Sequence, residues 1–299
     1  MNKTLKIFLP LVFVSVLLGA TITQAAYGVT IGEIFIYDVE AASWDMAVDT
    51  SSSSGTGFNF LDVKRAVGTQ LEVEVTAVST SSVDWDMTIG EETDSGSSSS
   101  FDTLGITLLA LFPLLLINAG TITWNQAEMD LGLEIISFFF AELESFGELF
   151  YTLIVEDIAT YYYTDPNYTF DNIGGTFDDD TNIAVFEWHL DLTYTNDSEI
   201  FAGNFVWQYA YDQTDGYMKG NYINMDYSGT INGISISYKF EQRVEEEGYN
   251  LPDVVTIETT ISTTTSTNAS TIPGFEWFIA IPIVTLLGGI TIVKRKHKA

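Results

Sequence analysis

The stretch FEWHLDLTY, residues 186–194, decides the fold class because its apolar and polar side chains alternate without a break. A period of two residues is typical of a β-strand with one face buried and the other in contact with solvent. The apolar face is built mainly from large and aromatic side chains, which strands favour. It consists of Phe186, Trp188, Leu190, Leu192 and Tyr194.

Further strands follow this stretch, separated by short runs of turn-forming residues. Consecutive strands joined by tight turns predict an antiparallel meander. Its interior is aromatic, which suits a sheet curved over a helix or over an apolar ligand. The predicted strands are 205–211, 217–227 and 234–244; the turns are 212–216 and the region bracketed by Ser228-Gly229 and Asn232-Gly233.

Strands are also predicted near the N-terminus, at 34–39, 71–77 and 83–89, since the last two again alternate apolar and polar residues. Two serine-rich runs, Ser51–Ser54 and Ser97–Ser100, carry no apolar side chains and are predicted as flexible loops.

The middle of the chain, about 103–163, has a different pattern and is predicted to be a helical insert. Asn125 with Glu128, and Ser145 with Glu148, have the spacing of helix-capping boxes. Asp165-Pro166 ends the region. The apolar residues that recur at helical spacing are Met129, Leu133, Ile136, Phe140 and Leu143, followed by Leu149 and Leu153.

Residues 104–117 are apolar enough to resemble a membrane span. Pro113 interrupts the run, and no lysine or arginine flanks it. About 14 apolar residues are more typical of a buried segment than of a crossing. We therefore expect this segment to be buried or lipid-facing structure within the ectodomain.

These patterns predict an α+β fold: a large curved antiparallel sheet, half-barrel or sandwich-like, with two or three helices inserted mid-sequence. One domain and two packed sandwiches both fit the sequence. A single C-terminal transmembrane helix completes the predicted architecture.

The N-terminus has the three parts of a secretory signal peptide. Lys3 and Lys6 precede an apolar run at 7–18, and small residues lead to a cut after Ala25. We expect residues 1–25 to be removed, which leaves residues 26–250 as a β-rich extracellular domain.

The C-terminus has the pattern of a membrane anchor. Trp277–Val293, 17 residues without a charge, is followed by the basic tail 294–299. Basic residues beside a span stay in the cytoplasm, so the tail is predicted inside and the ectodomain outside. Residues 251–272 are rich in threonine and serine and are predicted to form a glycosylated stalk. The expected location is the cell membrane, with a single crossing.

The predicted exterior is strongly acidic. It holds all 41 acidic residues but only five basic ones, a formal charge of −36. Such a field repels nucleic acid, so no nucleic-acid partner is expected. The chain has no cysteine, which excludes disulfides, thiol catalysis and thiolate metal sites.

The segment Thr271-Ile272-Pro273-Gly274-Phe275, followed by an apolar helix and a basic end, resembles the C-terminal sorting signals of archaeal surface proteins. In that family a membrane sortase is the processing partner that the resemblance implies, with Pro273, Gly274 and Phe275 as the sorting motif. Glu276 departs from the motif, whose best-known version has glycine there. The ectodomain start, Tyr27-Gly28-Val29 before the first strand, looks like Asgard-type "choice-of-anchor" proteins, which implies a surface location and no known activity.

Catalytic signals are weak, and we predict neither an enzyme nor a cofactor. His189 is the one histidine of the exterior, lies within a predicted strand, and is expected to be structural. Asp178, Asp179, Asp180 and Asn182 lack calcium-loop spacing and are interpreted as a solvated turn, so no metal site is predicted. Glycosylation sequons begin at Asn167, Asn196 and Asn268.

Two functions remain. The first is an acidic structural or interaction module of the cell envelope. The second is an extracellular binder of an apolar ligand, a lipid or isoprenoid, held between the aromatic sheet and the apolar middle segments. The sequence does not specify an oligomeric state. The residues expected to line such a cavity are Leu108, Leu111, Phe112, Leu115, Ile136, Phe140, Trp188 and Trp207.

Overall fold

A computed structural model of the chain describes residues 27–99, 133–136, 138–143, 167–178, 181–196, 199–231 and 233–254. All of these belong to one compact unit, Ala26–Thr265. The predicted signal peptide, sorting motif, membrane helix and basic tail lie outside the described residues. Within those residues, no helix has the length and apolar character that crossing a membrane requires.

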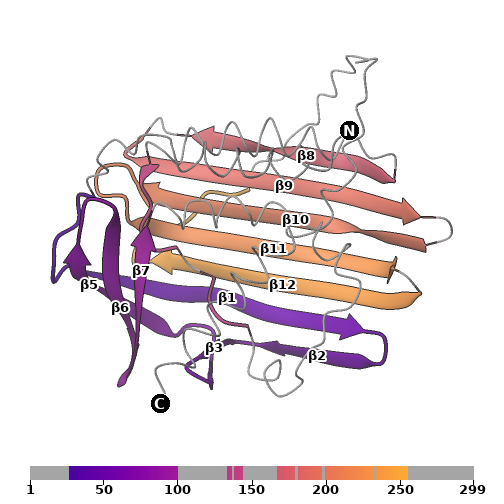
Figure 1. Cartoon of the computed structure of the whole chain (residues 1–299), viewed down its shortest axis with the longest axis horizontal. Helices are drawn as coiled ribbons and strands as arrows, with labels where there is room; N and C mark the ends of the chain where they lie inside the picture. The colour runs from indigo at the N-terminus through magenta and orange to yellow at the C-terminus, as the bar shows by residue number, and fades with distance from the viewer. Residues whose placement is uncertain are drawn as a thin grey trace, which may run out of the picture. The chain divides into compact units, whose positions relative to one another are not determined.

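Ten of the described strands form one large, open antiparallel sheet, which confirms the prediction of a large antiparallel sheet (Figure 1). Its order is β7-β6-β5-β1-β12-β11-β10-β9-β8, and β2 also pairs with β1. The strands are β1 Ile34–Val48, β2 Ser51–Thr56, β5 Gln70–Val78, β6 Ser82–Ile89, β7 Glu92–Ser99, β8 Tyr168–Asp178, β9 Ile183–Asn196, β10 Glu199–Asp212, β11 Met218–Ile231 and β12 Ile234–Glu246.

The predicted meander is present in β8 to β12, where each strand pairs with the next in sequence. Few residues separate these strands, and Gly233 between β11 and β12 takes a left-handed conformation (φ 77°) that glycine adopts at little cost. A turn also follows β10 at Asp212, as predicted, but Ser228 and Gly229 lie inside β11 rather than in a turn.

Strand β1 joins the N-terminal and C-terminal strands into one sheet. One of its edges pairs with β12 from Tyr37 to Val48. Its other edge is divided, because β5 pairs with Ile34–Asp38 and β2 pairs with Ser43–Val48. A bulge between Val39 and Ala41 lies near the point of division. In Figure 1, β5, β6 and β7 are turned steeply against the long strands.

Strand alternation gives the long strands two unlike faces. The register places Trp188, Trp207 and Ile223 in one row on one side, which we call the aromatic face. Gln242 and Ala42 continue the same row. The opposite side, the polar face, carries a parallel row across β9 to β12 that consists of Glu187, Gln208, Tyr222 and Arg243.

Residues 133–136 and 138–142, which we call the crossing segment, pack on the aromatic face. The predicted helix does not extend over them, since Asn59 bridges to Glu134 and Phe140 to Tyr217 as isolated β-bridges. Their backbone bonds go to the sheet: Met218 N donates to the carbonyl of Phe139 at 2.7 Å. Groups bonded in this way cannot form the i to i−4 bonds of a helix. The rest of the predicted insert lies outside the described residues.

The two serine-rich runs are strands, so the prediction of flexible loops is wrong for β2 and for the described part of 97–100, which belongs to β7. In each strand a tryptophan of the neighbouring strand lies over a glycine: Trp44 over Gly55, and Trp85 over Gly96. The indole nitrogens donate to Ser53 at 3.2 Å and to Ser98 at 3.0 Å. These tryptophans supply the packing that the serines lack.

Candidate functional site

A pocket of about 470 Å³ lies on the polar face, beside β1 and β12. Its volume falls within the range of small-molecule sites. We call it the acidic pocket, because four of the side chains that line it are carboxylates. Its lining is Asp38, Glu40, Arg243, Glu245, Glu246, Gly248, Tyr249 and Asn250.

Strand pairing places these side chains together. Asp38 of β1 is opposite Glu245 of β12, and Ala41 is opposite Arg243, so all four positions face the same side of the sheet. The bulge next to Glu40 interrupts the alternation there. Residues 248–250, just after the end of β12 at Glu246, complete the lining.

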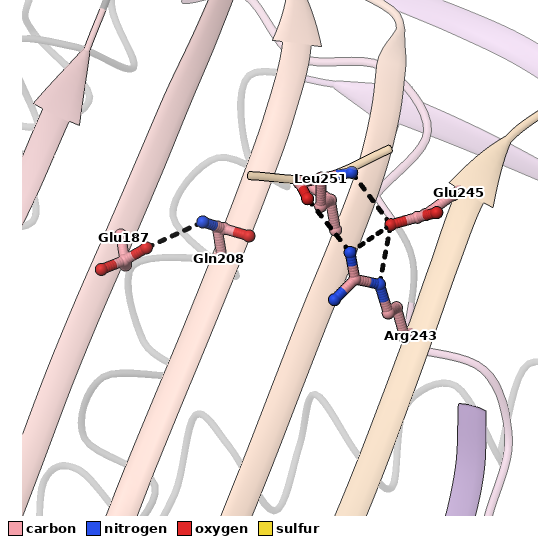
Figure 2. Close-up of polar contacts among 5 residues, drawn as sticks. All are labelled: Glu187, Gln208, Arg243, Glu245 and Leu251. Atoms are coloured by element: carbon pink, nitrogen blue, oxygen red, sulfur yellow. Dashed lines mark hydrogen bonds and ion pairs between the residues drawn. The ribbon is translucent and has the colours of Figure 1, made fainter. Parts of the chain in front are cut away.

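An ordered network holds the wall that Glu245 and Arg243 form (Figure 2). Glu245 Oε1 accepts a bond from Arg243 Nε at 2.7 Å and another from the backbone N–H of Leu251 at 2.9 Å. Arg243 Nη2 donates in turn to the Leu251 carbonyl at 3.1 Å. Leu251 is buried, although the sequence places it first in the stalk, so the chain remains docked on the sheet at that residue.

A second wall of the pocket is partly neutralised. Lys219 pairs with Glu246 and donates to the Tyr217 hydroxyl at 3.0 Å. Burial lowers the pKa of Lys219, but these two partners outweigh it and leave the pKa raised. Burial also raises the pKa of the nearby Tyr249 hydroxyl, although Lys219 opposes that shift. Both groups therefore keep their protons at neutral pH.

Asp38 and Glu40 differ from the other two carboxylates, because neither has a charged or hydrogen-bonded side-chain partner among the residues that the structure describes. Asp38 is half-buried and Glu40 is exposed. The pocket therefore presents two uncompensated negative charges next to one tyrosine ring.

Farther along the polar face, β9 and β10 carry a buried polar cluster. Glu187 is 1 % exposed; its Oε1 lies 2.5 Å from His189 Nε2, and its Oε2 accepts from Gln208 Nε2 at 2.7 Å (Figure 2). His189 is thus a strand histidine, as the sequence predicts. Burial raises the pKa of the neighbouring Asp191, against a lowering effect of His189.

The predicted lining of an apolar cavity divides into two groups. Phe140, Trp188 and Trp207 are completely buried on the aromatic face, and the backbone of Ile136 is bonded by Gln242 and Asn221. These contacts are those of a packed core. Within the described ranges, the buried Trp188 Nε1 has no hydrogen-bond acceptor. The other four predicted lining residues, Leu108, Leu111, Phe112 and Leu115, lie outside the described residues.

Of the three sequons, Asn167 is exposed in the turn before β8, where a glycan has room. Asn196 ends β9, and Asn268 lies outside the described residues. Within the described ranges, no three histidine or carboxylate side chains are grouped so that they could hold a metal ion.

Sequence reasoning missed the acidic pocket. The available signal was Arg243, one of five basic residues in the predicted exterior, followed closely by three consecutive glutamates at 245–247. The sequence does not show that β1 pairs with β12, because Asp38 and Glu40 lie about 200 residues before Arg243 in the chain. Neither a family model nor a curated protein matches this chain.

Proposed function

We propose that this protein is a membrane-anchored cell-surface module whose acidic ectodomain binds cationic groups of a partner in the acidic pocket. The predicted signal peptide, stalk and C-terminal helix support the surface location. The predicted transmembrane helix, and the part of the predicted helical insert outside the described residues, belong to the same proposal. No catalysis is included in it.

The observation that carries the proposal is the pair of uncompensated carboxylates, Asp38 and Glu40, in a pocket of about 470 Å³. An ammonium or guanidinium group is the natural complement of such a pair, because ionised hydrogen bonds are the stronger kind. The ring of Tyr249 already has a cation over it, because Lys219 Nζ lies 5.7 Å from its centre, so the two carboxylates carry the proposal alone. An anionic or purely apolar group would leave both carboxylates unpaired at a cost in binding.

The alternative, a carrier of an apolar ligand, rests on the aromatic face. The described residues there are packed against the crossing segment by four polar contacts, from Tyr209, Tyr211, Asn221 and Gln242 to its backbone. A ligand would have to displace these contacts or lie elsewhere. The acidic pocket is therefore the better-supported site.

The test is a calorimetric titration of the full chain, in detergent, with a short peptide that carries one lysine. We expect saturable binding that Asp38→Asn with Glu40→Gln weakens by about tenfold or more, the equivalent of about 1.4 kcal/mol. Glu72→Gln with Glu74→Gln is the matched control, since it removes two exposed charges from β5. Equal binding by both double variants would contradict the proposal.

A further inference from the structure

The short hairpin of β3 (Phe58–Phe60) and β4 (Val63–Arg65) has an unusual tip. Phe60 pairs with Val63, so the loop contains only Leu61 and Asp62, with φ of 49° and 62°. Two-residue loops of this kind favour asparagine and glycine. A leucine in the left-handed region is strained, and such strain is found preferentially at functional positions.

The same hairpin exposes apolar side chains. Leu61 is 36 % exposed and Val63 is 39 % exposed, while Val67, just after β4, is 43 % exposed. Phe58 and Phe60 are buried and hold the hairpin in place. The leucine at the tip is therefore not needed for the core. An asparagine at this position would reduce the backbone strain.

Lys64 is exceptional among the basic residues of the exterior. Arg65, Lys219, Lys239 and Arg243 each pair with a carboxylate. Within the part of the chain that the structure describes, Lys64 has no such pair; its Nζ lies 4.7 Å from the centre of the Trp44 ring, and the residue is exposed. The hairpin thus joins a small apolar patch to the one cation that lacks a carboxylate partner among the described residues.

We propose that the β3–β4 hairpin of one copy docks in the acidic pocket of a second copy, with Lys64 opposite Asp38 and Glu40. This inference rests on the proposed function and names its partner. Charge complementarity supports it, because an unpaired cation on a chain this acidic meets uncompensated carboxylates on every other copy. Leu61 and Val63 would then be covered at the rim of the contact.

The sheet itself prevents a copy from binding its own hairpin. Lys64 lies over Trp44, which is opposite Phe240 and two residues after Ala42 on β1, so it belongs to the aromatic face. The pocket residues Asp38 and Arg243 point to the polar face of the same strands. Hairpin and pocket are therefore on opposite sides, and copies can associate only head to tail. Such a contact is heterologous and links molecules into closed rings or open chains.

The experiment uses two fluorescently labelled versions of the full chain in detergent, at about 0.15 M salt so that long-range repulsion between the acidic copies is screened. One version carries Lys64→Glu and keeps its pocket. The other carries Asp38→Asn with Glu40→Gln and keeps its hairpin. We expect energy transfer when the two are mixed, and none when either is mixed with itself. Association of each version with itself, or no transfer in the mixture, would overturn the inference.

Leu61→Asn is a second variant, in which a loss of association could not be attributed to misfolding. Because asparagine tolerates the left-handed conformation, thermal stability should stay equal or rise, whereas self-association should fall about tenfold. Unchanged association in this variant would count against the docking surface.

The two proposals can fail separately. If the native chain does not associate with itself but still binds the lysine peptide, only this inference fails. If the peptide also fails to bind, the proposed function fails as well.

Discussion

At the scale of single residues, the polar face buries carboxylate and amide side chains, which are rarely buried, and most of these side chains have hydrogen-bond partners. Glu187 and Gln208 are each 1 % exposed and are bonded to one another. A buried carboxylate is costly unless its oxygens accept hydrogen bonds. The sequence predicts His189 as structural but does not predict its bond to Glu187. Two polar residues that are two positions apart on a strand have the same pattern whether they contact each other or are both exposed to solvent.

Gln208→Leu should destabilise the protein by roughly 1–3 kcal/mol, because it leaves Glu187 Oε2 buried without its donor. Adding Glu187→Leu to it should recover part of that loss, since the buried carboxylate that lost this donor is then removed. The free energy of unfolding from urea titration measures both effects. A double variant whose loss of unfolding free energy exceeds the summed losses of the two single variants would contradict this account.

Asp191 gives a pH-dependent prediction. Its pKa is raised above the ordinary 3.8, chiefly by burial, so the folded state binds the proton more tightly than the unfolded chain does. Ionisation of Asp191 therefore costs stability, and this cost is absent below pH 3.8 and grows as the pH rises through the raised value.

We accordingly expect Asp191→Asn to raise the unfolding temperature at neutral pH, with a gain that shrinks as the pH falls toward 3.8. Asp84→Asn, at an exposed acid on β6, serves as the control and should change little. A gain that grew on acidification would show that the sign is wrong.

At the scale of elements, long alternating segments were the best guide. The strands around residues 71–77, 83–89, 186–194 and 205–211 could be predicted because apolar and polar side chains alternate along them, and the one at 34–39 because it is a short apolar run rich in isoleucine and aromatic residues. The serine-rich strands β2 and β7 could not, since Trp44 and Trp85 on neighbouring strands supply their packing. The crossing segment was predicted as helix because its apolar spacing is helical, but its backbone is bonded to the sheet.

Gly96→Ala tests how β7 is held. An added Cβ would lie 2.3 Å from the Trp85 ring, so the indole must move and its bond to Ser98 is strained. We expect a loss of roughly 1–3 kcal/mol in unfolding free energy and a red-shifted tryptophan emission. Ser97→Ala, at the exposed next position of β7, is the control. Equal behaviour of the two variants would remove the role given to Trp85.

Gln242→Ala tests the crossing segment. Gln242 accepts from Ile136 N and donates to its carbonyl, both at 2.8 Å. Without it, the amide of Ile136 should exchange with deuterium faster, and stability should fall by roughly 1–3 kcal/mol. Gln70→Ala, on an exposed position of β5, is the matched control. Unchanged exchange at Ile136 would contradict the proposed packing.

At the scale of the whole molecule, the two faces of the sheet have different roles in this account. The aromatic face is a core that the crossing segment covers, and the polar face carries the acidic pocket. The sequence predicts an acidic exterior and leaves the number of domains undecided. It does not predict the pocket, because the pocket depends on the pairing of β1 with β12, two strands that are far apart in the chain. Such long-range pairing leaves no local pattern to detect.

The most direct test of the central claim measures binding of a labelled single-lysine peptide to intact cells that produce the full chain. Cells with the native chain, or with Glu72→Gln and Glu74→Gln, should bind the peptide at their surface. Cells with Asp38→Asn and Glu40→Gln should lose most of that binding at equal surface abundance. Equal binding by all three, or binding that appears only after the membrane is permeabilised, would contradict a cell-surface module that acts through the acidic pocket.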